Sequence, residues 1–192
     1  YIQQLYPRMK ALSESQQRFR SVLFVTSAGC APVPGIGRKS DAQCASFIER
    51  GLETARRRDV PVVVVGGSWL GLLGRGDYYL LDDPAETIID LKDPEVLDDV
   101  LVPLEQALTE LVGLGKQVYF VLAPPGGGLA DPESIPGARL GAADQGLPVK
   151  SIPIEDHLRR TGDVNTRLRA LAERAAVQVI DPAGWICDDE AC

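Results

Sequence analysis

Four short runs of branched apolar residues alternate with stretches of helical hydrophobic spacing, and this alternation constrains the fold more than any other feature. The runs occupy residues 21–27, 61–65, 117–123 and 177–181. Strands that are buried on both faces of a parallel sheet appear as near-continuous apolar runs, and helices connect such strands. The sequence therefore predicts an α/β fold, a three-layer sandwich around a parallel sheet, formed by a single domain of 192 residues.

Three amphipathic stretches supply the expected helices. They should begin at Asp41, Asp93 and Asp163, because an aspartate side chain can accept a hydrogen bond from the free N–H groups of a helix start. Gly115 should end the second helix, and Pro103 should kink or divide it, since proline removes a backbone hydrogen bond. The residues expected to face the core from the third helix are Val164, Leu168, Leu171 and Ala175.

The two ends of the chain do not follow the alternation. Ile2, Leu5, Met9 and Leu12 form a helical stripe that no strand precedes, and the run at 177–181 is followed only by a loop with two cysteines. Because a strand normally feeds the first helix of an α/β fold, we expect the domain to lack its first strand and its last helix.

Three long loops follow the carboxyl ends of the first three predicted strands, at residues 28–40, 66–93 and 124–150. Ligands bind at that edge of an open parallel sheet, and loops of this length tend to be functional. The first two loops should lie side by side, because the strands before them are expected to be neighbours. The second loop contains YYLL and TIIDL around DDPAE, which suggests a small hairpin.

Charge and hydropathy exclude some classes of function. The net charge is −7; residues 77–110 carry −10 and the rest of the chain +3. An acidic surface argues against binding to nucleic acid or anionic lipid by charge attraction. No apolar run approaches the roughly 20 residues of a membrane-spanning helix.

Four cysteines fall into two local pairs, Cys30 with Cys44 and Cys187 with Cys192. Three pairings are possible, and local pairing is the simplest. Disulfides would place the domain in an oxidising compartment such as the periplasm. The alternative is a zinc site, but one histidine and wide spacings fit zinc poorly, so no metal is expected.

One serine and one histidine could form a self-contained esterase. Ser68 lies in GGSWLG, which is similar to the G-x-S-x-G turn of α/β-hydrolases, but the last glycine comes one residue late at Gly71 and the residues that follow are poor helix formers. His157, the only histidine, lies in a charged and helical stretch, where we expect an exposed surface residue and not a catalytic base.

The order of the motifs resembles one family, the SGNH-type domains that are fused to acyltransferase-3 membrane domains. The motifs are SAGCAP at residues 27–32 with Cys44 downstream, VVVVGGSW at 62–69, LVGLGK at 111–116 followed by VYFVLAPP, Asn165, the Asp181-Pro182 pair, and the final Cys187–Cys192 loop. The resemblance implies an SGNH-hydrolase-like fold of the flavodoxin-like kind. It covers nearly the whole chain.

The resemblance implies a serine–histidine–aspartate mechanism that transfers an acyl group, usually acetyl, to hydroxyls of a cell-surface glycan, without a cofactor. The family's G-D-S-H block should precede Tyr1 and its D-x-x-H block should follow Cys192, so the catalytic residues are expected outside the chain. The implied location is the periplasm, attached to the inner membrane through the acyltransferase-3 transmembrane domain of the same polypeptide.

Within the chain, the resemblance leaves candidates for the oxyanion and substrate loops. Gly29 stands where the family carries the glycine of its second conserved block, and Gly67, Ser68 and Trp69 stand where it carries the asparagine of its third block. Trp69 could stack on a sugar ring or fill the core. A glycan-binding module that kept the fold and lost the chemistry remains an alternative, as does the esterase that uses Ser68 and His157.

Overall fold

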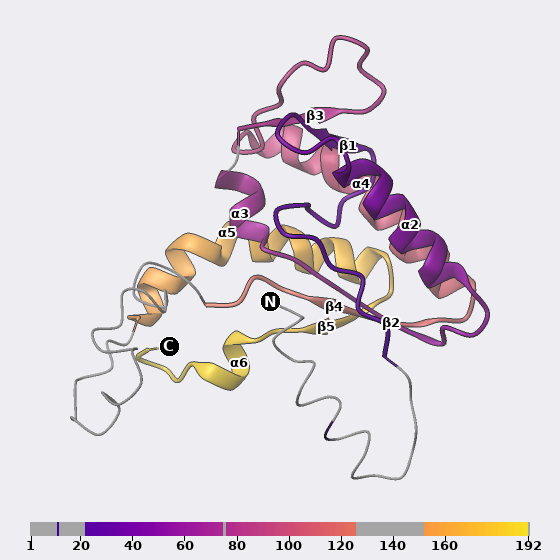
Figure 1. The fold of residues 1–192 in the computed structure, drawn as a ribbon. Helices are drawn as coiled ribbons and strands as arrows, with labels where there is room; N and C mark the ends of the chain where they lie inside the picture. Colours follow the sequence, from indigo (N-terminus) through magenta and orange to yellow (C-terminus); the bar gives the residue numbers. More distant parts are fainter. Residues whose placement is uncertain (1–10, 12–21, 75, 126–151, 192) are drawn as a thin grey trace, which may run out of the picture.

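A parallel three-stranded sheet forms the centre of the molecule (Figure 1). The computed structural model describes residues 11, 22–74, 76–125 and 152–191. The strands are β2 (Val62–Gly66), β4 (Gln117–Val121) and β5 (Gln178–Ile180), in the order β2-β4-β5. Both pairings are parallel, with Val64 opposite Tyr119 and Phe120 opposite Val179. The predicted α/β fold around a parallel sheet is confirmed.

Three long helices cover the sheet: α2 (Cys44–Arg56), α4 (Pro94–Gly113) and α5 (Ile154–Arg174). Helix α4 contacts both α2 and α5, and Figure 1 shows all three on the same side of the strands. The core between these helices and the sheet includes Val118, Phe120, Leu104, Leu108, Leu111, Leu168 and Leu171, each at most 3% exposed. Burial of such side chains contributes most of the stability of a domain like this one.

Ion pairs join the helices at the surface. The Arg56 guanidinium of α2 donates to both carboxylate oxygens of Glu110 on α4, at 2.9 and 2.8 Å. These hydrogen bonds lower the pKa of Glu110 and raise that of Arg56. Arg174 of α5 pairs with Glu105 of α4, with Nη2 2.7 Å from the carboxylate. Exposed pairs contribute little each, so the apolar core remains the main contact between the helices.

The first predicted strand is not a strand. Residues 22–27 have no regular secondary structure, and Val22, Leu23 and Val25 are 44%, 68% and 41% exposed. The expected pairing of this run with residues 61–65 was therefore wrong, because β2 pairs only with β4 among the described residues. An apolar run alone does not make a strand, because strand formation also depends on the tertiary surroundings of the run, which its sequence pattern does not specify.

A small antiparallel sheet lies beyond the central one. Its strands are β1 (Ile36–Arg38), from the first long loop, and β3 (Tyr78–Leu80), from the second. An antiparallel bridge between Tyr79 and Ile88 closes the second loop on itself, where the sequence predicted a small hairpin. The two long loops are thus joined by backbone hydrogen bonds. The third loop lies mostly outside the described residues, as does the helical stripe of Ile2, Leu5, Met9 and Leu12.

The helix boundaries confirm two predictions and correct another. Asp93 caps α4 by accepting a hydrogen bond from the Glu95 N–H at 3.0 Å, and Gly115 follows the helix with a positive φ of 76°. Pro103 stays within this helix and does not divide it. Helix α2 begins at Cys44 with Gln43 as N-cap, whereas Asp41 closes the turn before it by accepting from the Gln43 N–H at 3.1 Å.

The larger correction concerns α5. This helix begins at Ile154, nine residues before the expected cap Asp163. The sequence predicted a helical stretch around His157 separately from the helix after Asp163, and the two form one helix that continues through Gly162. It does so because Thr161 and His157 lie one and two turns before Val164 on the same buried face. The expected inward residues of the second half, Val164 to Ala175, are buried as predicted.

Candidate functional site at the carboxyl edge of the sheet

The first long loop and the turn after β2 touch each other. A Cβ atom placed on Gly67 would lie 2.8 Å from Cδ of Pro32, so only a glycine leaves room for this contact. Strand β2 ends at Gly66, which puts the contact at the carboxyl edge of the sheet. The expectation that these two loops lie side by side is confirmed, although residues 22–27 are not a strand.

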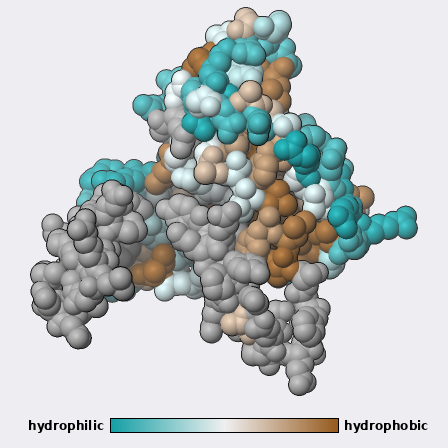
Figure 2. Space-filling model, in the orientation of Figure 1, coloured by the Kyte–Doolittle hydropathy of each residue, from teal (hydrophilic) through white to brown (hydrophobic). Residues whose placement is uncertain are grey.

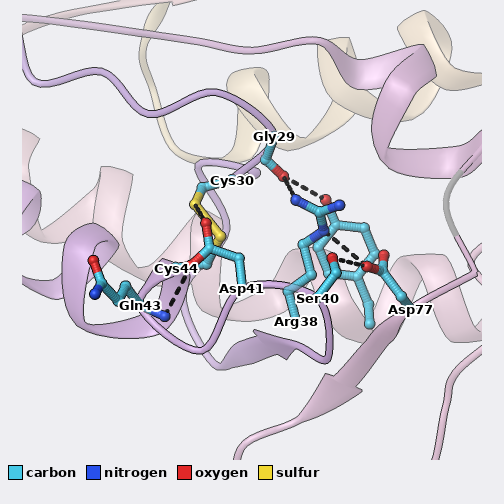
Figure 3. Close-up of polar contacts among 9 residues, drawn as sticks. Gly29, Cys30, Arg38, Ser40, Asp41, Gln43, Cys44 and Asp77 are labelled. Carbon is cyan, nitrogen blue, oxygen red and sulfur yellow. Dashed lines mark hydrogen bonds and ion pairs between the residues drawn. A yellow bond between two sulfur atoms is a disulfide. The ribbon is translucent and has the colours of Figure 1, made fainter.

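Gly29 has a conformation that other residues rarely adopt. Its φ is +81°, in the left-handed region where glycine has no steric penalty. Its carbonyl oxygen accepts two hydrogen bonds, from Arg38 Nη1 and from the Tyr78 hydroxyl, both at 3.3 Å (Figure 3). No described residue accepts a hydrogen bond from the Gly29 N–H. The sequence singled out Gly29 but gave no sign that Arg38 and Tyr78 hold it.

A charged group behind Gly29 holds Arg38 in place. The Asp77 carboxylate accepts from Arg38 Nε at 2.9 Å and also from the hydroxyl of Ser40. The side chains of Arg38 and Asp77 are 13% and 26% exposed, so this ion pair is partly shielded from water. Figure 3 shows Arg38 between Asp77 and Gly29. Residues of β1 and of the segment before β3 therefore fix the back of the Gly29 loop.

The expected disulfide between Cys30 and Cys44 is confirmed, and it ties the residue after Gly29 to the first residue of α2. Cys187 is also disulfide-bonded, while Cys192, its expected partner, lies outside the described residues. The Cys30 and Cys44 sulfurs lie close to the carboxylate of Asp41, a group that could hold a metal ion. Because both sulfurs are joined to each other, neither is a thiolate, and this group is not a metal site.

Trp69 belongs to the core and does not face a ligand. It begins the short helix α3 (Trp69–Gly74) and is 1% exposed. Its ring packs against Phe120 with centroids 5.2 Å apart, and its indole N–H donates to the Val121 carbonyl at 2.8 Å. The candidate role in stacking on a sugar was therefore wrong, because α3 turns this side chain toward β4. The residues after Ser68 also form a helix, which their composition did not predict.

Ser68 and His157 do not form a catalytic pair among the described contacts. Ser68 is exposed and precedes α3, with its hydroxyl directed toward Gly71, where an added Cβ would lie 2.6 Å away. The nucleophile of a hydrolase elbow sits in a strained turn. Among the described residues other than glycine, only Glu86 and Ala176 have positive φ, so Ser68 lacks that strain.

His157 is buried, contrary to the expectation of a surface residue, and is only 2% exposed. Its Nδ1 lies 3.3 Å from the Thr161 hydroxyl, one turn further along α5. The neighbouring Asp156 pairs with Arg159, so it does not orient the imidazole ring. The spacing of His157, Thr161, Val164 and Leu168 at four, three and four residues could have shown this burial from the sequence.

Asn165 holds the end of β4. Its side-chain oxygen accepts from the Ala123 N–H at 3.0 Å, and its side-chain nitrogen donates to the Ala123 carbonyl at 3.3 Å. Asn165 is 8% and Ala123 1% exposed, so both backbone groups depend on this amide. The sequence marked Asn165 as part of the family pattern, and the structure gives the reason for an asparagine there.

Comparison with known protein families identifies the chain. A family model described as "SGNH domain (fused to AT3 domains)" matches residues 3–192. The chain belongs to this family. Searches of curated proteins and of solved structures found no match. The chain is thus an acyltransferase-associated SGNH module that is linked to an acyltransferase-3 (AT3) domain. None of its described helices combines the length and the apolar character needed to cross a bilayer.

Proposed function

We propose that this SGNH domain lies in the periplasm and helps its AT3 domain to transfer an acyl group, usually acetyl, to hydroxyls of a cell-surface glycan. The observation that carries the proposal is the contact between the Gly29 loop and the Gly67 turn at the carboxyl edge of the sheet. In a member of this family, that edge is where a serine nucleophile would meet an acyl group. Two features of the loop add support: the disulfide between Cys30 and Cys44 suits an oxidising compartment, and it also restrains the backbone next to the left-handed Gly29.

The proposed chemistry is acyl transfer through a serine. The serine oxygen attacks the carbonyl of the acyl donor while a histidine takes the serine proton. Collapse of the tetrahedral intermediate breaks the bond to the donor's leaving group, which takes that proton from the histidine, and an acyl-enzyme remains. A sugar hydroxyl then attacks this ester, the same histidine takes the hydroxyl proton, and the serine leaves with a proton. In both intermediates the carbonyl oxygen carries a negative charge, which backbone N–H groups stabilise. In our proposal the N–H of Gly29 is such a donor, and Gly67 and Ser68 belong to the neighbouring oxyanion loop.

We place the serine and the aspartate–histidine pair in segments of the complete protein that flank these residues. Val63 and Val65 pack on the core, so Val64 points to the other face of β2, where it is 51% exposed. Strands of parallel sheets are usually covered on both faces. Figure 2 shows a hydrophobic patch where β2 and residues 22–27 lie in Figure 1. In the part of the chain that the structure describes, no helix lies over this apolar surface, and we propose that a further strand and helix of the complete domain pack there.

Hydrolysis of an activated acetyl ester tests the proposal. We expect the complete protein to turn the ester over, and the 192-residue chain alone to do so only faintly. Gly29→Ala keeps the N–H but disfavours the φ of +81° that directs it, so turnover of the complete protein should fall by up to about 100-fold, the cost of losing an oxyanion donor elsewhere. Gly115→Ala is the matched control, because Gly115 has a similar φ of +76° and no atoms near its Cα hydrogens.

Two results would replace this proposal with an alternative. If the short chain matched the complete protein and Ser68→Ala or His157→Gln abolished turnover, the domain would be the self-contained esterase. If both proteins were inactive but bound the glycan, it would be a glycan-binding module.

A further inference from the structure

The contacts of the Gly29 carbonyl suggest how the oxyanion loop is kept in shape. Glycine is the residue with the greatest backbone freedom, so an N–H donor on a glycine is fixed only if its surroundings fix it. Here two side chains that come from other segments hold the carbonyl oxygen of Gly29. They are Arg38 on β1, nine residues along the chain, and Tyr78 on β3, 49 residues along the chain.

Both side chains are themselves held. Tyr78 is 2% exposed and belongs to the core, so its hydroxyl has little freedom to move away from Gly29. Arg38 is oriented by Asp77, which accepts from its Nε while its Nη1 donates to Gly29 (Figure 3). The pairing of β1 with β3 places Arg38 directly opposite Tyr78. The two donors therefore reach the glycine from one rigid sheet.

A fixed carbonyl also fixes the N–H of the same residue. Each peptide unit is a rigid plane because its C–N bond has partial double-bond character, so φ and ψ of Gly29 are the only soft angles between its N–H and its carbonyl. The disulfide of Cys30 restrains the chain immediately after this carbonyl. With the carbonyl held and φ in the left-handed region, the N–H of Gly29 has one direction.

We propose that Arg38 and Tyr78 are positioning residues, which hold Gly29 in the left-handed conformation that presents its N–H to the oxyanion. Asp77 acts through Arg38. The inference rests on the proposed function, because it assigns to Gly29 the role of oxyanion donor. Neither side chain touches the reacting atoms, so their loss should change the rate of the chemical step and leave substrate binding largely intact.

Kinetics of the complete protein test the effect on the reaction. Tyr78→Phe should lower kcat roughly tenfold and Arg38→Met on the order of 100-fold, as expected for loss of a neutral and of a charged hydrogen bond, with KM unchanged. Arg38→Lys should restore part of the loss. Tyr79→Phe, on the same strand, and Arg57→Met, whose guanidinium pairs with Asp59 at the surface, are the matched controls and should keep the wild-type kcat.

Backbone relaxation of the 192-residue chain tests the positioning without any activity. The amide order parameter of Gly29 should be about 0.85 in the wild type, as in rigid backbone, and below about 0.6 in the Arg38→Met/Tyr78→Phe double variant. Tyr79→Phe should leave it unchanged. An unchanged Gly29 order parameter in a folded double variant would refute the inference.

The two experiments separate the inference from the proposed function. If the wild-type complete protein had no turnover, the proposed function would fail, while the relaxation experiment would still decide whether Arg38 and Tyr78 hold Gly29. If the wild type were active and both variants retained its kcat, the positioning role would be wrong and the proposed function would stand.

Discussion

Replacement of Asn165 by alanine should destabilise the domain strongly, because it removes both hydrogen-bond partners of one buried residue. The amide of Asn165 accepts from the N–H and donates to the carbonyl of Ala123, which is 1% exposed. A buried backbone group without a partner costs about 1–3 kcal/mol, and two such groups are left. Alanine is a better helix former than asparagine and recovers about 0.7 kcal/mol or less in α5. The expected net loss is about 3 kcal/mol.

Urea unfolding followed by circular dichroism measures this loss in the free energy of unfolding. Thermal unfolding gives a second measure: in a protein of 150–250 residues each kcal/mol shifts the melting temperature by about 2–4 °C, so it should fall by about 6–12 °C. Thr166→Ala is the control: Thr166 is exposed and its hydroxyl donates only to the Gly162 carbonyl of its own helix. Its effect should stay within about 0.5 kcal/mol.

Asn165→Asp sharpens the test. It keeps the acceptor for the Ala123 N–H but turns a carboxylate oxygen toward the Ala123 carbonyl, so at pH 7 it should cost at least as much as Asn165→Ala. If Asn165→Ala lowered the free energy of unfolding by less than about 1 kcal/mol, water or a rearranged chain would be pairing with the backbone groups of Ala123. The two hydrogen bonds from Asn165 would then not stabilise the end of β4 as argued here.

Two further changes test other contacts. Cys44→Ala should lower the free energy of unfolding by about 3 kcal/mol, since the disulfide to Cys30 closes a loop of 14 residues. The wild type in reductant should lose at least as much stability. A smaller loss would show that this bond adds little to the stability of the domain. Trp69→Ala should cost about 3–5 kcal/mol, as other large core residues do, whereas Trp69→Phe should cost less. Equal and small losses for both Trp69 variants in urea unfolding would contradict the buried position of this ring.

The sequence predicted those parts of the fold that depend on neighbouring residues. The cap at Asp93 and the end of α4 near Gly115 depend on a few adjacent positions, and both were predicted correctly. The Cys30–Cys44 bond was predicted from the local spacing together with an expected oxidising compartment. The apolar runs of β2, β4 and β5 were also recognisable, because a strand that is buried in a parallel sheet carries its pattern along its own length.

Contacts between distant segments were not predictable in the same way. The apolar run at residues 22–27 reads like the other strands, but a strand also requires a ladder partner, which the run itself does not specify. Trp69 could face either a ligand or the core, and only the path of α3 over Phe120 decides between them. His157 is the exception: its spacing to Val164 and Leu168 carried the information, and the charges around it concealed the pattern.

The candidate site shows the same division between local and distant information. A motif can mark Gly29, since a glycine after a predicted strand suggests a close backbone approach. What gives this glycine a defined direction comes from three contacts that no motif contains: the bond of Cys30 to Cys44, the Arg38 guanidinium and the Tyr78 hydroxyl. An oxyanion donor is effective only when it is preorganised, because reorienting a backbone dipole during the reaction would cost the energy that the donor supplies. The small β1–β3 sheet therefore contributes to the proposed chemistry through the rigidity that it gives to one peptide group.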